Sequence, residues 1–151
     1  MPYQGVTLDF GSPFRRVTMN DLVKELTGTD FLAFGADVAA ARAAARAALD
    51  AQPDRDLRRK AGAKVDGQPT VGHVLNEMFE AVGEATLVQP TFVLEHPTEI
   101  SPLAKPHRSK PGVTERCGAA RGGGVAGPRS RCFSFLCQPR PTPRFPSDQN
   151  R

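Results

Sequence analysis

The amino-acid sequence predicts an α+β domain over residues 1–116, followed by a tail of different character over residues 117–151. Residues 71–82 repeat apolar side chains at the spacing of one helix face. Residues 92–94 form a short apolar run typical of a strand. The charge also changes at residue 117: the first part carries 14 Lys and Arg against 15 acids, a net −1, and the tail carries 6 against 1, a net +5.

The first predicted element is a strand or hairpin arm over residues 3–10, which alternate loosely and include β-prone side chains. Thr18 then predicts a helix start, because its hydroxyl can accept a hydrogen bond from a free amide of the first turn. This helix should end at Gly28. Asp37 begins a second predicted helix, rich in alanine, the residue of highest helix propensity. Its inward stripe should be Val38, Ala41, Ala45, Ala48 and Leu49.

Residues 52–69 are polar, with Pro and Gly near both ends, and predict a surface connection. Thr70 caps the next predicted helix. Pro90 then begins a strand over residues 92–94, since proline cannot donate a ladder hydrogen bond, and this apolar run suits a strand covered on both faces. The buried face of the helix should consist of Val71, Val74, Leu75, Met78, Phe79 and Val82.

The tail, residues 117–151, holds 5 Gly, 5 Pro and 6 Arg and is predicted to be disordered, because it cannot bury enough apolar area to offset the entropy of ordering it. It contains all three cysteines, at spacings that match no common zinc site. Its glycine-rich run, residues 122–127, lacks the Lys-Ser/Thr of a phosphate loop. The sequence has no run of 18 apolar residues that would predict a membrane span, and its N-terminus lacks the pattern of a signal peptide.

Three groups of charged residues are candidates for function. Arg42 and Arg46 favour a solvated helix face, and the run 58–60 favours a solvated loop over a contact with nucleic acid. His73 and Glu77 are four residues apart and could share a metal, but an exposed helix pair is favoured because no third ligand is near in sequence.

The most compact titratable cluster is Glu95, His96 and Glu99. It could be a metal or proton-transfer set. On spacing alone, a strand end that emerges into solvent is the favoured interpretation.

Several segments in order resemble the class II lysyl-tRNA synthetases of bacterial type. The longest is residues 89–116, QPTFVLEHPTEISPLAKPHRSKPGVTER, and the others are Tyr3-Gln4-Gly5, Pro13-Phe14-Arg15-Arg16-Val17-Thr18-Met19, Thr70-Val71-Gly72 and Asn76-Glu77-Met78-Phe79. In the family the first of these short segments lies well inside the catalytic domain, so the resemblance implies an internal fragment over about residues 3–116, between motifs 2 and 3.

The resemblance implies an antiparallel sheet flanked by helices. It also implies a parent enzyme, a homodimer, that forms lysyl-adenylate from lysine and ATP with Mg²⁺ and passes the lysyl group to tRNA. The cytoplasm, a plastid or a mitochondrion would all suit such an enzyme, and the sequence does not choose among them.

No catalytic, cofactor-binding or metal-binding residue of the family maps onto this chain. Motif 2 would precede Met1 and motif 3 would follow residue 116. The family continues after Thr-Glu-Arg as a strand, Phe-Glu-Leu-Phe, whose acid would fall at Gly118. The chain alone is therefore expected to be inactive. Two alternatives are an RNA-binding or interaction protein that uses the basic tail, and a gene-model product without function.

Overall fold

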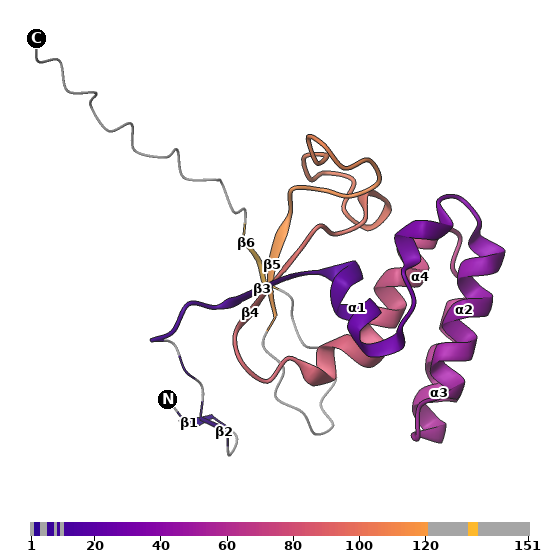
Figure 1. The fold of residues 1–151 in the computed structure, drawn as a ribbon, viewed down its shortest axis with the longest axis horizontal. Helices are drawn as coiled ribbons and strands as arrows, with labels where there is room; N and C mark the ends of the chain where they lie inside the picture. The colour runs from indigo at the N-terminus through magenta and orange to yellow at the C-terminus, as the bar shows by residue number, and fades with distance from the viewer. Residues whose placement is uncertain (1, 4–5, 8, 10, 121–132, 136–151) are drawn as a thin grey trace, which may run out of the picture.

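The computed structural model describes residues 2–3, 6–7, 9, 11–120 and 133–135 (Figure 1). It contains a helical layer beside a small sheet, with a long loop that projects beyond the sheet. In chain order the elements are β1 (Pro2–Tyr3), β2 (Val6–Thr7), β3 (Arg15–Thr18), α1 (Met19–Thr27), the 3₁₀ turn η1 (Phe31–Phe34), α2 (Val38–Asp50), α3 (Arg55–Asp66), α4 (Val71–Met78), the π-helical turn η2 (Phe79–Gly83), the 3₁₀ turn η3 (Glu84–Thr86), β4 (Thr91–Leu94), the 3₁₀ turn η4 (Thr98–Ile100), β5 (Cys117–Ala120) and β6 (Phe133–Phe135).

The main sheet has the order β3-β4-β5-β6 and is mixed. β4 and β5 are antiparallel, as are β5 and β6, but β3 and β4 are parallel. The expectation of an antiparallel sheet is therefore wrong for one pair. The reason is the connection: the chain leaves β3, runs through the whole helical layer and returns to the same end of the sheet, and only such a crossover can join parallel neighbours.

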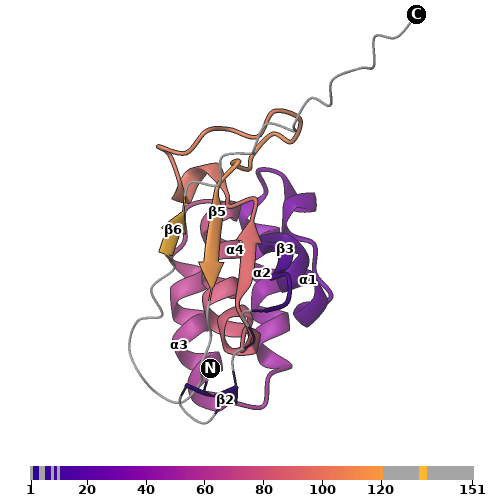
Figure 2. The ribbon, with the colours of Figure 1, turned by 90° about the vertical axis from the view of Figure 1, so that its left-hand side faces the viewer.

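One face of this sheet is covered by helices, which lie behind the strands in Figure 2. Val17 of β3 and Val93 of β4 are register partners and both are buried. Arg16 and Phe92, also partners, lie on the opposite face, where Phe92 is half-buried. β4 is thus buried on one face only, which corrects the prediction of a strand covered on both.

The predicted helices are confirmed where an apolar stripe and a cap coincide. Thr18 Oγ1 accepts from the Asp21 amide, and α1 ends at Gly28, whose φ of 74° suits glycine. Asp37 and Thr70 cap α2 and α4 in the same way. All six residues of the predicted face of α4 and η2 are buried, namely Val71, Val74, Leu75, Met78, Phe79 and Val82.

The prediction of a surface connection over residues 52–69 is wrong, because α3 occupies most of it. Asp54 caps α3 by accepting from two amides of the first turn, and Ala61 and Val65 are buried against the core. Arg46 of α2 forms an ion pair with Asp66 of α3, so this arginine is not merely solvated. The buried stripe of α3 is narrow, and its many charges obscured the helix period in the sequence.

The tail prediction fails for the residues that form β5 and β6. Cys117–Ala120 pair antiparallel with β4, and Cys117 is only 2% exposed. Backbone hydrogen bonds to the free edge of β4 need no particular side chains, so a Gly- and Ala-rich segment can fill this place. The rest of the predicted disordered tail, residues 121–132 and 136–151, lies outside the described residues, as does the glycine-rich run.

β1 and β2 pair with each other antiparallel, so the segment predicted as one strand or hairpin arm over residues 3–10 instead contains a reversal of the chain between two short strands. Across the part of the chain that the structure describes, no helix combines the length and the apolar character that crossing a membrane requires.

Candidate functional site

The end of β4 has the only positive φ found at a non-glycine residue in the described structure. Glu95 has φ 56°, a conformation that costs a non-glycine residue about 1 kcal/mol or more and persists only where its surroundings impose it. Its carboxylate lies 2.6 Å from Lys110 Nζ and 4.0 Å from His107 Nε2. Glu95 therefore joins the end of the strand to the tip of the 97–115 loop.

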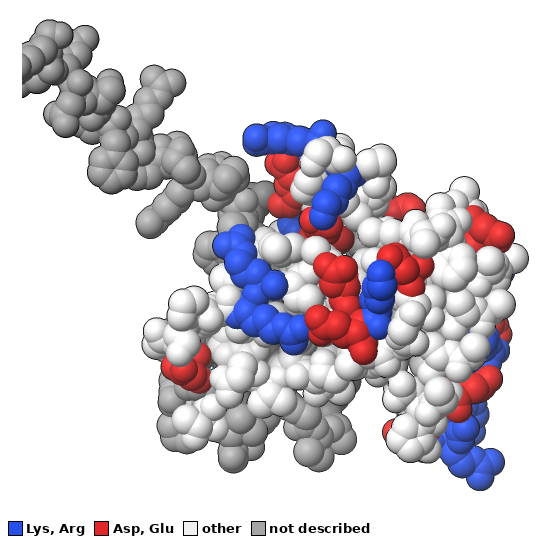
Figure 3. Space-filling model, viewed as in Figure 1, with Lys and Arg blue, Asp and Glu red and all other residues white. Residues whose placement is uncertain are grey.

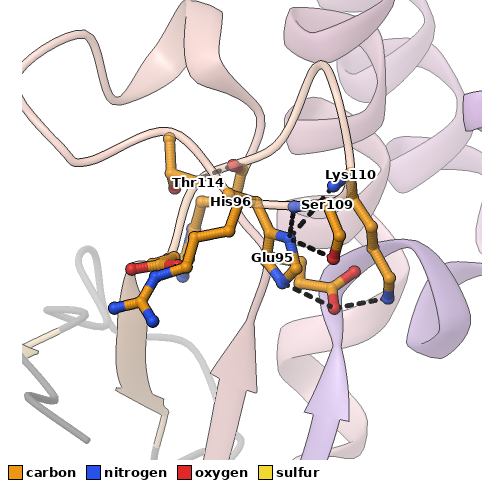
Figure 4. Close-up of polar contacts among 8 residues, drawn as sticks. Glu95, His96, Ser109, Lys110 and Thr114 are labelled. Carbon is orange, nitrogen blue, oxygen red and sulfur yellow. Dashed lines mark hydrogen bonds and ion pairs between the residues drawn. The ribbon is translucent and has the colours of Figure 1, made fainter.

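His107 organises that tip, where Figure 4 labels Ser109 and Lys110 beside Glu95. Its Nδ1 accepts hydrogen bonds from the backbone amides of Ser109 and Lys110, at 3.2 and 3.1 Å. Because Nδ1 is used as an acceptor, the proton of the neutral ring resides on Nε2, the nitrogen that faces Glu95. The histidine thus fixes the turn through one nitrogen and faces the carboxylate with the other.

A second carboxylate holds the base of the loop. Glu115 lies 3.0 Å from Arg108 Nε and 3.7 Å from Lys105 Nζ, and its amide donates to the Lys105 carbonyl at 2.8 Å. Two isolated bridges, between residues 97 and 113 and between 106 and 114, close the same loop. The loop is therefore tied by backbone bonds and by two carboxylates that each contact two basic groups.

His96 lies beneath the loop and is a structural residue. Its carbonyl accepts from both the amide and the hydroxyl of Thr114, at 2.9 and 3.0 Å. Burial, and then the charge of Arg116, lower the pKa of His96 from 6.5 to about 4, so its ring is neutral at pH 7. Its Nε2 is buried without a hydrogen-bond partner among the described residues.

Between the loop and β3 lies an open cleft of about 380 Å³. It is lined by Arg16, Leu94, Glu95, His107, Arg108, Thr114, Glu115, Arg116 and Cys117. Counting Lys105 and Lys110, which contact the lining carboxylates, five cationic side chains surround the cleft against two carboxylates. The surplus of three positive charges means that the cleft attracts anions.

The sequence cluster Glu95, His96 and Glu99 does not form one site. Glu95 faces the cleft, His96 is buried, and Glu99 is exposed on η4, where its carboxylate approaches Gly72 at the start of α4. No group of three metal-ligating side chains occurs anywhere in the described residues. The favoured interpretation as a solvated strand end is right for Glu99 and wrong for His96.

His73 and Glu77 do not form a site together either, because each contacts other residues. His73 Nδ1 lies 2.8 Å from the Thr70 hydroxyl, while Glu77 contacts Lys64 Nζ at 3.4 Å and accepts from Gln68 at 3.3 Å. Both are half-buried rather than exposed. Glu77 thus links α4 to Lys64 of α3, whereas His73 contacts the N-cap of its own helix.

The sequence did not reveal the residues that give the cleft its positive charge. Arg16 lies on β3, a four-residue strand that periodicity does not reveal, and Arg108 and Lys110 read only as part of a basic loop. Their carboxylate partners are 7 and 15 residues away. In the sequence, this arrangement is indicated only by the acidic residues at the two ends of the loop and the basic residues at its tip.

Position 118, where the family resemblance places an acid, can now be located. Gly118 is the register partner of Val93, and cross-strand partners lie on the same face of a sheet. Val93 is fully buried on the helix-covered face. A carboxylate at position 118 in this register would therefore point toward the core and not toward the cleft.

Comparison with known proteins finds close relatives of one kind. The chain is 52% identical over 115 residues to a lysine–tRNA ligase of Thermosynechococcus vestitus, 47% identical over 114 residues to one of Prochlorococcus marinus, and 48% identical over 114 residues to the chloroplastic/mitochondrial lysine–tRNA ligase of Arabidopsis thaliana. Each match covers 76% of this chain. No protein-family model matches the chain.

The same matches cover only 18–20% of the relatives' own length. The extent of the match, 114–115 residues, is close to that of the segment 3–116 singled out by its motifs. The described fold, α+β with a mixed sheet, is compatible with part of such an enzyme. The chain therefore belongs to the lysine–tRNA ligase family and spans about a fifth of the length of its relatives.

Proposed function

We propose that this chain is part of the catalytic domain of a class II lysine–tRNA ligase, the region between motifs 2 and 3. The observation that carries this proposal is the identity of 46–52% to lysine–tRNA ligases over three quarters of the chain. The complete enzyme, a homodimer, would form lysyl-adenylate from lysine and ATP with Mg²⁺ and transfer the lysyl group to tRNA.

The residues of this chain do not fit the Mg²⁺–ATP part of that reaction. Mg²⁺ needs carboxylates that are free to accept it, and the two carboxylates of the cleft each contact two basic groups. The chain's own contribution is structural: β4 extends the sheet, and α4 with η2 supports its covered face. By itself it should not activate lysine.

We also propose that the family-like part of the chain ends at residue 116, and that β5 is built from unrelated residues. Amide hydrogen exchange tests this division. Residues 117–120 and 133–135 should be protected through the pairing of β5 with β4 and β6, and the Pro- and Arg-rich residues 138–151 should exchange rapidly because of their composition. Slow exchange across residues 138–151 would contradict the proposed tail.

A chimera tests the catalytic proposal. Residues 3–116 replace the matching segment of the Thermosynechococcus vestitus enzyme, and lysine-dependent ATP–pyrophosphate exchange is measured. This chimera should be active, because the catalytic groups come from the host. A second chimera that also carries Cys117–Ala120 should lose exchange, since the acid of the host strand is gone. Exchange by the isolated chain above a no-lysine control would overturn the proposal.

A further inference from the structure

The conformation of the tip of the 97–115 loop depends on a single histidine. The His107 amide donates to the Val113 carbonyl at 3.0 Å, so the backbone is fixed on both sides of residues 108–112. Between these two points, the amides of Ser109 and Lys110 donate to His107 Nδ1. The part of the chain that the structure describes offers these two amides no other acceptor. Residues 107–110 are called the tip turn below.

The two bonds of the tip turn require a neutral imidazole ring. Nδ1 can accept a hydrogen bond only while it carries no proton, because both nitrogens of a charged histidine are donors. The Ser109 hydroxyl, 3.4 Å from Nδ1, can donate to it as well. Protonation of His107 would therefore place a new N–H group against the two amide N–H groups of the turn. Histidine is also the side chain whose ordinary change of charge falls between pH 5 and 8.

A protonated ring has a partner on its other side. His107 Nε2 lies 4.0 Å from Glu95 Oε1, and the two side chains are 24% and 16% exposed, so water and salt screen their attraction only in part. The same carboxylate oxygen lies 2.6 Å from Lys110 Nζ. A charged His107 ring competes with Lys110 for that oxygen. Protonation thus weakens both the backbone bonds and the ion pair that hold the tip turn.

The other charged groups around His107 are mostly basic. In Figure 3 basic side chains gather on the strand region and again on the projecting loop, with acidic side chains between them. A charge on His107 adds to this surplus, so the neighbouring cations repel the ring away from its closed position while Glu95 attracts it. The charged residues that line the cleft with His107 and Glu95 are Arg16 of β3 and, from the loop and its end, Arg108, Glu115 and Arg116.

We propose that His107 is a pH-sensitive switch of the loop: the neutral ring closes the tip turn, and the protonated ring opens it in exchange for an ion pair with Glu95. Arg108 and Lys110 belong to the tip turn, so its opening moves two of the cations that surround the cleft. The positive charge presented to the cleft therefore depends on pH. The switch follows from the geometry of the loop and does not rest on the proposed function.

Nuclear magnetic resonance on the ¹⁵N-labelled full chain tests the switch. At pH 8 the ring nitrogens of His107 should report a proton on Nε2 and none on Nδ1. The amides of Ser109 and Lys110 should then exchange with water about tenfold more slowly than in an unstructured peptide at the same pH, as the free energy of one net hydrogen bond gives. At pH 5 this protection should disappear.

Two substitutions at His107 separate the hydrogen bonds from the titration. The side-chain oxygen of Asn can accept from the amides two and three residues further on, but it does not titrate in this range. His107→Asn should therefore keep the amides of Ser109 and Lys110 protected at both pH values. His107→Ala should leave them unprotected at both. A general loss of structure would remove the protection from both variants alike.

Three further variants assign the switch to the correct groups. Glu95→Gln should make the opening require a lower pH, because the charged ring loses its partner. His96→Leu should keep the pH dependence of the tip turn, since the pKa of His96 is about 4 and its ring stays largely neutral at pH 5. His73→Gln should keep it too, because His73 contacts Thr70 of another element.

Equal protection of the two amides at pH 8 and pH 5 would overturn the proposal, as would a proton on Nδ1 of His107 at pH 8. A pH dependence that persists in His107→Asn, or that is lost in His96→Leu, would show that another group controls the loop.

Discussion

The helical layer and the sheet-and-loop half of this molecule are stabilised by different forces. In the helical layer Leu22, Val23, Leu75 and Phe79 are all at most 2% exposed and belong to one apolar core. The loop is instead tied by ion pairs, backbone bonds and the buried carbonyl contact of His96. Local sequence patterns therefore determine the fold of the helical layer, whereas the sheet-and-loop half depends on contacts between residues that are far apart in the chain.

The largest effect that would test the helical half is the loss of its central aromatic side chain. Phe79→Ala removes a ring that is 2% exposed and should lower the free energy of unfolding by about 3–5 kcal/mol through lost burial and a cavity. Urea denaturation measures it. Leu103→Ala, at a fully exposed loop residue, is the matched control. If Phe79→Ala lowers the free energy of unfolding by less than about 1 kcal/mol, Phe79 is not part of the core.

The buried histidine gives the corresponding test of the loop half. The pKa of His96 is about 4 in the folded chain and 6.5 when exposed, so the unfolded chain binds the proton first as the pH falls. The free energy of unfolding should therefore decrease by about 3 kcal/mol between pH 6.5 and 4 from this residue. Denaturation curves at several pH values measure this contribution.

His96→Leu should remove this contribution and leave only the pH dependence of the other groups. His73→Gln is the matched control and should keep the full slope. If the wild-type chain and His96→Leu have the same slope, His96 is not buried in its neutral form.

The junction between the two halves can be tested at Gly72. A Cβ there would lie 2.5 Å from Glu99 Oε2 and 2.7 Å from Pro97 Cβ, so α4 and η4 approach too closely for any other residue. Gly72→Ala should destabilise the fold by about 1–3 kcal/mol. Thermal unfolding would measure it. Gly67→Ala, whose Cβ would meet its nearest neighbour at 3.6 Å, should be nearly neutral.

The smallest effect concerns the ion pair between Arg46 and Asp66. Both side chains are about half-exposed, at 44% and 50%, so the pair should contribute less than about 1 kcal/mol. A double-mutant cycle with Arg46→Ala and Asp66→Ala measures the coupling, and salt should reduce it. A coupling above about 2 kcal/mol would show that charges, and not only burial, hold α3 against α2.

The same contrast explains which parts of the structure the sequence could predict. The stripe from Val71 to Val82 and the caps Thr18, Asp37 and Thr70 are local, so periodicity and capping chemistry located them. α3 was missed because only a few small residues along it are buried. β3 was missed because it is four residues long and owes its place to β4.

The cleft was beyond sequence reasoning for a related reason. Glu95 and Lys110 are 15 residues apart, and their contact depends on how the loop returns to the strand. Burial of His96 depends on the same return, through Thr114. Neither periodicity nor spacing encodes that path.

Strand β5 shows that shape and chemistry can separate within one fold. Cys117–Ala120 complete the antiparallel pair with β4 although their side chains have little in common with the strand expected from the family. The open edge of β4 selects an extended backbone and is nearly indifferent to side-chain identity. A comparison of backbone shapes would therefore count this strand as retained, whereas a comparison of reactive side chains would count it as lost.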